Sequence, residues 1–446
     1  MQEKPISLRK RLFYTRSVTD ASRTRAVLNN AILHLHPTTI PVPALRFTYT
    51  WGLGGISTVL AFLLGFTGLL LMFRYDANVG SAYHSIQLLE AQVVFGALIR
   101  AVHHWSANLL VVISFLHLVR VFATGGYKRG RTMNWLVGVV LFVIILAFNF
   151  TGYLLPWDQL AYWAITVSTS LLSYIPLIGD LLRNFFLGGA DVGQSTLRNF
   201  YAIHVALLPV LLVGAVSYHF WKIRKNGGIS QPERQNGSAA ERLTTIPNLV
   251  QREFAVGAIV IVVVLLFSMF TPAPLAGIAD PVHSPNPAKA AWYFMGLQEL
   301  LLHMDALAAI GVVGIVLLAM FSIPYLDRRG SDIGIYFRSK KGKIAALVGA
   351  LLALDLVPLL VIADQFWVDV STWVPGASPG LTNALIPFSL TILGLLLIYG
   401  LIRLFVQANH SESMVGIFIF VIIGLVVLTV IGVYFRGPNM ALVLPF

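Results

Sequence analysis

Long apolar runs separated by short polar segments make up almost the whole chain. Nine of these runs are about 20 residues long, the length that a helix needs to cross a hydrocarbon layer roughly 30 Å thick. In lipid such a run must be helical, because a helix satisfies its own backbone hydrogen-bonding groups. The pattern therefore predicts nine membrane-spanning helices, at approximately 51–73, 98–120, 134–155, 199–221, 253–271, 307–326, 343–363, 384–405 and 415–435.

The predicted fold is all-α, a polytopic transmembrane helical bundle that one polar stretch divides. Residues 226–248, NGGISQPERQNGSAAERLTTIPN, are the only long interior segment with the composition of a linker. We predict a cytoplasmic N-terminal segment at 1–46, a four-helix unit at 47–225, a cytoplasmic linker at 226–248, a three-helix unit at 249–365 and two additional transmembrane helices at 366–446.

The composition agrees with a protein whose main solvent is lipid. Of the 446 residues, 57% are hydrophobic and only 11% are charged, and the mean hydropathy is +0.78, far from the values of soluble globular domains. The chain has no cysteine, which excludes disulfides, thiolate-bound iron–sulfur clusters and thioether-linked haem within it. Any cofactor must therefore bind through other ligands.

Positive charge is distributed in a way that indicates topology. The net charge is +12, but the lysines and arginines fall in alternate loops, as the positive-inside rule requires, so nucleic-acid binding is not indicated. Residues 1–46 lack the apolar core of a secretory signal and are expected to stay in the cytoplasm. The path of nine helices then starts inside and ends outside. The basic inside segments are the N-terminal residues, the loop with Lys128, Arg129 and Arg131, the loop at 222–252 and the loop at 328–343.

Four histidines within the predicted spans form two matched pairs. His103 and His117 are fourteen residues apart on the second span, and His204 and His219 are fifteen apart on the fourth. Four helical turns take about 14.4 residues and advance about 21 Å, so each pair returns to nearly one face of its helix. Two facing helices of this kind can hold two stacked metal centres. His104 is one residue off this face and is interpreted as a structural histidine.

Neutral imidazole is a natural axial ligand of haem iron, and a bis-histidine site leaves no open position on the iron. Such a site suits electron transfer more than oxygen binding. The alternative is that each histidine bonds a backbone carbonyl in the helix bundle. Matched spacing of four histidines on two helices favours the haem.

Glycines on the first and third spans have the same spacing of fourteen residues. The pairs are Gly54 and Gly68 on the first span, and Gly138 and Gly152 on the third. Glycine permits the close backbone approach that a flat macrocycle needs, although small residues also serve ordinary helix packing in membranes. From the topology, the outer level should contain His103, His204, Gly68 and Gly152, and the inner level His117, His219, Gly54 and Gly138.

Two arginines, Arg100 and Arg120, flank the histidines of the second span. Their guanidinium groups could bind haem propionates in a forked geometry. Their alternative role is to extend to the membrane interface, as long cationic side chains often do.

Several segments resemble the cytochrome b of Rieske/cytochrome b complexes, the quinol-oxidising complexes of respiration and photosynthesis. The resemblance covers about residues 40–365. Within it, the fifteen-residue spacing on the fourth span is similar to that of the photosynthetic and Gram-positive branch, and the chain looks like that cytochrome fused to its three-helix partner, subunit IV. The last two helices have no counterpart in that pattern. The matching segments are RAVHHWSANLLVVISFLHLVRVFATGG, TGYLLPWDQLAYWA, DVGQSTLRNFYAIH and YHFWKIRKNGG.

The resemblance implies a quinol-oxidation site on the outer side, built from loop helices after the third and fifth spans. It also implies a second quinone site near the inner haem, and a Q-cycle that divides two electrons between a Rieske iron–sulfur protein and the two haems. A c-type cytochrome subunit, a dimeric complex and a bacterial-type cytoplasmic membrane belong to the same expectation. The residues carried over to the quinol site are Tyr153, Pro156, Trp157, Asp158, Gln159, Trp292 and Tyr293.

The chain departs from the family pattern at the quinol site. The family's Pro-Glu-Trp-Tyr motif, whose glutamate is thought to accept a quinol proton, is replaced here by Ala290, Ala291, Trp292 and Tyr293. Glu299, about two turns onward, is the candidate replacement, since a proton acceptor needs only hydrogen-bond reach, directly or through water. The alternative is that Glu299 is a solvated carboxylate at the end of the loop.

Three functions are consistent with these observations. The favoured one is a dihaem cytochrome b subunit of a quinol–cytochrome c reductase-type, proton-translocating complex. The second is a dihaem membrane anchor that links another dehydrogenase to the quinone pool, for which four helices would suffice. The third is a transporter or channel in which buried histidines relay protons. A reduced-minus-oxidised b-type absorption band separates the first two from the third.

A second departure lies at Gly52, where the photosynthetic branch has a cysteine that attaches an extra haem. Without that thiol, we predict two b-type haems, both non-covalent, and no covalent haem on this chain. A pyridine haemochrome assay after acid–acetone extraction should leave no haem with the polypeptide. Haem that resists extraction would contradict this prediction.

Overall fold

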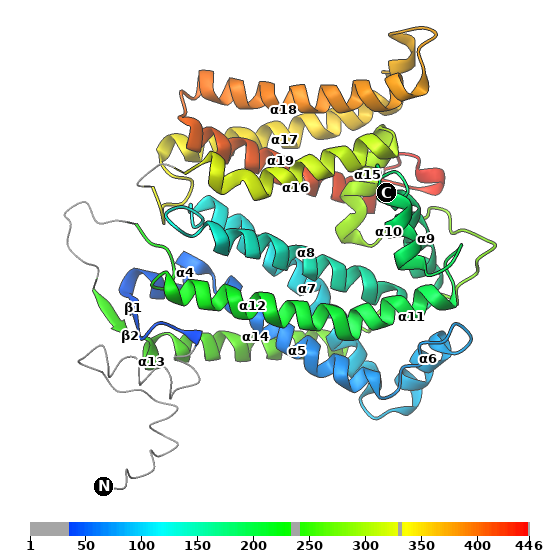
Figure 1. Ribbon diagram of the computed structural model, residues 1–446, viewed down its shortest axis with the longest axis horizontal. Helices are drawn as coiled ribbons and strands as arrows, with labels where there is room; N and C mark the ends of the chain where they lie inside the picture. The colour runs from blue at the N-terminus through cyan, green and yellow to red at the C-terminus, as the bar shows by residue number, and fades with distance from the viewer. Residues whose placement is uncertain (1–34, 233–240, 329–331, 445–446) are drawn as a thin grey trace.

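The computed structural model describes residues 35–232, 241–328 and 332–444. Over these ranges, nine helices are long and apolar enough to cross a membrane, and they lie roughly alongside one another (Figure 1). The predicted fold class, an all-α transmembrane bundle, is confirmed. Most of the predicted cytoplasmic segment at 1–46 and residues 233–240 of the predicted linker lie outside the described residues.

Each predicted span corresponds to one observed helix or one continuous run of helices. The spans are Leu53–Met72 (α5), Gly96–Ala123 (α7), Thr132–Leu154 (α8), Gln194–Lys225 (α11, η2 and α12), Thr245–Phe270 (α13 and α14), Ala306–Leu326 (α16), Lys340–Phe366 (α17), Gly380–Phe405 (η5 and α18) and His410–Tyr434 (α19). Several extend beyond their apolar stretch, because polar residues such as Lys340 and Lys341 continue the helix outside the apolar window.

Shorter elements connect the spans. Two loop helices after the third span are α9 (Gln159–Leu172) and α10 (Gly179–Leu187), and the loop after the fifth span contains η3 (Trp292–Phe294) and α15 (Met295–His303). The apolar pattern did not predict α6 (Ala82–Gln92) or α10, since both are short and half-exposed. The remaining elements are η1 (Val42–Leu45), α4 (Phe47–Thr50), η4 (Val370–Thr372), η6 (Pro438–Met440) and an antiparallel pair of strands, β1 (Thr39–Pro41) with β2 (Arg242–Thr244).

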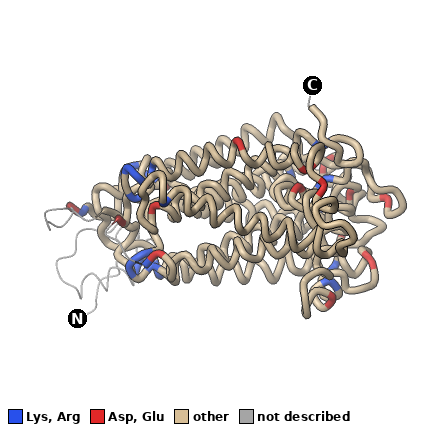
Figure 2. The backbone as a smooth tube through the Cα atoms, turned by 90° about the horizontal axis from the view of Figure 1, so that it is seen from above, with Lys and Arg blue, Asp and Glu red and all other residues tan. Residues whose placement is uncertain are grey.

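Charged residues gather at the two ends of the helices, with lysines and arginines mainly at one of them (Figure 2). We call this the basic end; it contains the loops after α7, α12, α16 and α18. The other end, called the opposite end, contains the loops after α5, α8, α14 and α17 and the residues after α19.

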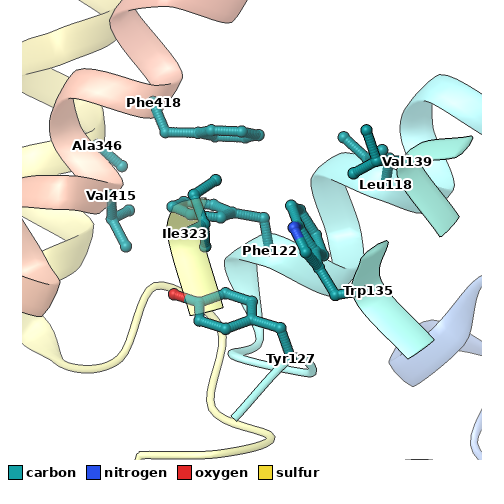
Figure 3. Close-up of a cluster of buried hydrophobic side chains, with 9 residues drawn as sticks. All are labelled: Leu118, Phe122, Tyr127, Trp135, Val139, Ile323, Ala346, Val415 and Phe418. Atoms are coloured by element: carbon teal, nitrogen blue, oxygen red, sulfur yellow. The ribbon is translucent and has the colours of Figure 1, made fainter. Parts of the chain in front are cut away.

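The last helix, α19, packs inside the bundle, whereas α18 lies at its edge (Figure 1). A Cβ added to Gly349 on α17 would lie 2.2 Å from the carbonyl oxygen of Gly416 on α19, so the backbones of α17 and α19 approach very closely, as small residues allow in membranes. The ring of Phe418 stacks on Phe122 of α7 with centroids 3.8 Å apart. Figure 3 shows this contact within a buried cluster drawn from α7, α8, α16, α17 and α19.

The helix α19 begins with a capping box formed by Asn409 and Glu412. The side chain of Asn409 accepts a hydrogen bond from the backbone N–H of Glu412, whose carboxylate accepts one from the backbone N–H of Asn409. This reciprocal capping box satisfies two donors that a helix start leaves free.

A buried ionic cluster at the basic end joins three separate parts of the chain. Nζ of Lys128, in the loop after α7, lies 3.0 Å from Oδ1 of Asp327 and 3.0 Å from Oδ1 of Asp332, both in the loop after α16. Arg338 contacts both carboxylates, and the hydroxyl of Ser411 on α19 donates to Asp327 at 2.9 Å. The cluster therefore fixes the basic end of α19 against both halves of the bundle.

Replacing Lys128 with methionine should destabilise the protein, because it leaves the buried Asp327 carboxylate with less compensation. Breaking a buried ion pair in this way costs about 3–5 kcal/mol of unfolding free energy. Thermal unfolding of the detergent-solubilised protein, followed by circular dichroism, measures the change. Lys341→Met, which removes an equal charge at an exposed hydrogen bond to the carbonyl of Gln407, is the matched control; equal loss in both variants would contradict the prediction.

Candidate functional site

A large apolar cavity of about 1860 Å³ lies within the four-helix half of the bundle. Its walls come from α5, α7, α8, η2 and α12, and the loop residues Trp292 and Tyr293 close part of its opposite end. Ligand pockets usually measure about 300–1,000 Å³. The cavity therefore has space for more than one organic ligand.

At the opposite end, the cavity is lined by His103 of α7 and His204 of η2. Their ring centres are 6.4 Å apart. His204 lies in a π-helical turn, Ile203–Leu207, within the fourth span. A π-turn accommodates one extra residue, so the fifteen-residue spacing on this span covers the same four turns as the fourteen residues on α7.

Nearer the basic end, the cavity is lined by His117 of α7 and His219 of α12. Nδ1 of His219 is buried and has no hydrogen-bond partner among the described residues. A buried polar atom without a partner is unusual and calls for an explanation.

Each predicted glycine faces one of these histidines. A Cβ on Gly152 would lie 2.7 Å from Cε1 of His204, and one on Gly68 would lie 3.2 Å from Cε1 of His103. Toward the basic end, the corresponding distances are 3.3 Å from Gly54 to Cε1 of His117 and 3.8 Å from Gly138 to Cε1 of His219. The structure thus brings the eight residues together in two groups, one at each level of the cavity.

Two threonines that the sequence analysis missed hold the histidines at the opposite end. Oγ1 of Thr67 lies 2.9 Å from Nδ1 of His103, and Oγ1 of Thr151 lies 3.0 Å from Nδ1 of His204. Each threonine hydroxyl also bonds a backbone carbonyl one turn earlier. The signal for them is a threonine directly before Gly68 and another directly before Gly152, on the first and third spans.

Arg100 and Arg120 line the cavity and are buried, so neither extends to the surface. Arg100 pairs with the carboxylate of Glu90 and donates to the carbonyls of Ala273 and Pro274. Arg120 donates to the carbonyl of Tyr49 through Nε and Nη2. Each guanidinium has five N–H donors, so both retain capacity for an anion in the cavity.

The loop after α8 is held by backbone contacts to the loop after α14. Oδ1 of Asp158 caps α9 by accepting from the backbone N–H of Ala161 at 2.9 Å, and Oδ2 accepts from that of Ala276 at 3.1 Å. The backbone N–H of Gln159 donates to the carbonyl of Gly277. Tyr153, Pro156 and Asp158 line the cavity, whereas Trp157 is buried in a hydrophobic cluster beside it.

Trp292 and Tyr293 reach the same cavity from η3. Nε1 of Trp292 donates to Oδ1 of Asn108 on α7 at 2.6 Å, and the hydroxyl of Tyr293 donates to the carbonyl of Asn149 on α8 at 3.1 Å. Burial raises the pKa of the Tyr293 phenol, and the nearby Tyr153 adds to this. The tyrosine is therefore a neutral hydrogen-bonding group at neutral pH.

Glu299 is buried outside the cavity. Its side chain is fully buried, which rules out a solvated carboxylate, and it does not line the cavity. Nε of Arg436 donates to both carboxylate oxygens at 3.1 Å, and Nε2 of His303 lies 3.3 Å from Oε1.

The charge states of Glu299 and His303 follow from these contacts. Burial tends to raise the pKa of Glu299, but the hydrogen bonds from His303 and Arg436 and the charge of Arg436 hold it below its usual value. Burial tends to lower the pKa of His303, but Glu299 and Asp364 raise it overall. The carboxylate of Glu299 is therefore ionised and already paired.

Adding a methyl group should lower the stability of the protein more at Gly152 than at Gly138. Gly152→Ala and Gly138→Ala both gain about 1 kcal/mol of helix propensity, but only the first places a Cβ within 3.0 Å of a histidine ring. Because overpacking a core costs about 1–3 kcal/mol, Gly152→Ala should be less stable than Gly138→Ala by about that amount. Thermal unfolding of the two variants measures the difference, and equal midpoints would contradict it.

The sequence of this chain is similar to those of known proteins. A family model described as "Cytochrome b/b6/petB" matches residues 38–227. "Cytochrome b6" of Prochlorococcus marinus (strain NATL1A) is 48% identical over 181 residues, which are 40% of this chain and 82% of that relative. "Cytochrome b6" of Synechococcus sp. (strain WH7803) is 46% identical over the same shares.

Among solved structures, a chain of a "Hyperthermophilic respiratory Complex III" is similar with a TM-score of 0.63. The match covers 86% of this chain and 92% of that chain at 20% sequence identity. At this level of identity the likeness concerns the fold, and it extends well beyond the residues that the family model matches.

Proposed function

This chain belongs to the cytochrome b/b6 family, and we propose that it is the dihaem cytochrome b subunit of a Rieske/cytochrome b-type quinol oxidoreductase. Membership of the family implies b-type haem and a subunit of a membrane complex that oxidises quinol. The observation that carries the finer proposal is the arrangement of two histidine pairs in one cavity, each opposite two glycines. We assign His103 and His204 to one haem, and His117 and His219 to the other.

The side chains fit this cofactor. Two facing imidazoles that line an apolar cavity are the residues that would hold a b-type haem, because neutral imidazole is a natural axial ligand of haem iron. The rings of His103 and His204 have centres 6.4 Å apart. The ring of His219 also lines the cavity, and its buried Nδ1 has no hydrogen-bond partner among the described residues, so no side-chain contact there competes with a ligand. When bound, each haem would carry one electron at a time through its iron.

Thr67 and Thr151 determine which imidazole nitrogen is available. Each threonine hydroxyl donates its proton to a backbone carbonyl on its own helix, so its oxygen accepts from the histidine Nδ1–H. The neutral ring then presents Nε2 as the metal ligand, and the hydrogen bond on Nδ1 fixes the ring orientation. Arg100 and Arg120, which retain free donors toward the cavity, are assigned to the haem propionates.

We place quinol oxidation at the opposite end of the cavity, among Tyr153, Pro156, Asp158, Trp292 and Tyr293. These residues and the pair His103 and His204 line one continuous space, so a quinol bound there would share the cavity with the residues assigned to the first haem. Trp157 supports this loop from the adjoining hydrophobic cluster.

Asp158 is our candidate for the carboxylate that accepts a quinol proton. Among the residues that line the cavity it is the one carboxylate, and its two backbone hydrogen bonds leave lone pairs free on both oxygens. Glu299, the candidate from sequence alone, is less suited because its ionised carboxylate is occupied by Arg436 away from the cavity.

The proposal includes the orientation of the protein in the membrane and its electron acceptors. By the positive-inside rule the basic end faces the cytoplasm, which puts quinol oxidation on the outer side and a second quinone site beside His117 and His219. A Rieske iron–sulfur protein and a c-type cytochrome are the proposed electron acceptors in a dimeric complex that runs a Q-cycle. The dihaem-anchor alternative does not account for Trp292 and Tyr293, which the back half brings into the cavity.

Replacing His204 with leucine should remove one of the two haems. The purified variant should show about half of the wild-type reduced-minus-oxidised b-type absorbance, because one axial ligand of one pair is gone. His104→Gln, on the same helix as His103 but outside the pairs, should keep both haems and serves as the control. Retention of two haems by His204→Leu would overturn the bis-histidine assignment.

The variant Asp158→Asn, which has nearly the same shape as the wild type, tests whether Asp158 accepts the quinol proton. Asp158→Asn keeps the helix cap, since asparagine caps about as well as aspartate, but removes the base and the acceptor for the backbone N–H of Ala276. We expect quinol oxidation to slow by about 10²–10⁴-fold, the usual contribution of a general base, and its pH dependence to change. A wild-type rate and pH profile in Asp158→Asn, together with a changed profile in Glu299→Gln, would reassign the function to Glu299.

A further inference from the structure

Arg436, just after α19, binds the loop helix α15, which directly follows the turn η3 with Trp292 and Tyr293. Glu299, on α15, is completely buried, and the side chain of Arg436, just after α19, is 1% exposed. The guanidinium of Arg436 binds the carboxylate through Nε and Nη2, and its Nη1 donates to Oε1 of Gln365 at 2.9 Å and to the carbonyl of Met440 at 3.0 Å. The pair therefore joins α15, the end of α17 and the segment after α19.

Further contacts show that α15 and α19 pack closely against each other. A Cβ on Gly296 would lie 2.7 Å from Cδ1 of Leu425, and one on Gly432 would lie 2.8 Å from Cε of Met295. Nζ of Lys289, three residues before Trp292, donates to the carbonyl of Val433 at 2.8 Å. The residues on both sides of Trp292 and Tyr293 thus contact the C-terminal half of α19.

The two aromatic residues are held from the other side by the histidine-bearing half. Trp292 donates to Asn108 on α7, and Tyr293 donates to the carbonyl of Asn149 on α8. Their positions therefore depend on how α15 is rotated and shifted along its axis relative to α7 and α8.

A buried ion pair is a poor device for stability alone. Removing two charges from water is costly, and well-packed apolar residues often stabilise a fold as much or more. A forked guanidinium–carboxylate contact, in contrast, defines both distance and orientation. Its presence here indicates that the orientation of α15 matters more than the strength of its attachment.

We propose that Arg436 is a positioning residue for the quinol site: by pairing with Glu299 it sets α15 so that Trp292 and Tyr293 face the cavity. The additional last helix is then part of the substrate site, although none of its residues lines the cavity. This inference rests on the proposed function, since it assigns the site on which Arg436 acts.

The test measures quinol binding separately from haem content in the intact complex. Arg436→Gln should raise the KM for a soluble quinol about tenfold or more, because a small displacement of substrate-contacting groups has large effects. Both haems and the pH profile should stay as in the wild type. Tyr399→Phe, which removes a hydrogen bond to His410 at the other end of α19, should leave KM unchanged.

The double variant Glu299→Gln/Arg436→Gln keeps the inference falsifiable if Arg436→Gln does not assemble. It has no uncompensated buried charge, and two amides can still bond across the gap but without the forked contact, so its KM should be higher than that of the wild type. A wild-type KM in Arg436→Gln with only a lower melting temperature would show a merely structural role and overturn the proposal. Failure of the double variant to accumulate with both haems would overturn it too.

Hydrogen exchange separates this inference from the proposed function. Backbone amides at 289–303 should exchange at least about tenfold faster in Arg436→Gln than in the wild type, because local opening of this segment becomes easier. If the wild-type complex does not oxidise quinol but this exchange still increases, the proposed function fails while Arg436 keeps its positioning role. Quinol oxidation by the wild type with unchanged exchange and KM in the variant would reject the positioning role alone.

Discussion

The bundle depends on one constraint, which is the need to place polar imidazole rings inside an apolar membrane interior. A ring nitrogen in lipid needs a hydrogen bond or a metal, because water is not there to supply one. In this chain Thr67 and Thr151 satisfy Nδ1 of two histidines, and glycines on the facing helices leave the rings space. The helices α5, α7, α8 and α12 therefore take positions that a fully apolar bundle would have no reason to adopt.

Features that follow from helical periodicity could be predicted from the sequence alone. The nine spans follow from the length of the apolar runs, and the grouping of eight residues at two levels follows from spacing within single helices and from the direction in which each helix runs. The loop helices at the quinol site were expected only from the family resemblance. Even the unequal spacing on the fourth span has a local cause, since the π-turn at Ile203–Leu207 absorbs the extra residue. That turn could not be foreseen, because hydropathy does not distinguish an α-turn from a π-turn.

Contacts between distant parts of the chain could not be predicted in the same way. Nothing near Glu299 in sequence indicates that its partner is Arg436, 137 residues further on, so sequence alone left open whether it was a proton acceptor or a solvated carboxylate. Arg100 and Arg120 likewise bond to Glu90 and to backbone carbonyls of remote loops. Asp158 was identified only by resemblance, and its access to the cavity became visible when the loops after α8 and α14 were seen together.

The position of α19 shows why buried charges occur in a bundle that is otherwise so apolar. Between helices in lipid there is little hydrophobic driving force, because the lipid chains are as apolar as the side chains, and close packing alone permits sliding along the axis. Here α19 is attached at both ends by polar contacts, to Asp327 through Ser411 at the basic end and to Glu299 through Arg436 at the opposite end. Two attachments about one membrane thickness apart define the axial position of the helix, and close contacts of Gly416 with Ala345 and of Gly432 with Met295 lie between them. Since α15 packs on the same helix, the register of α19 is passed directly to Trp292 and Tyr293.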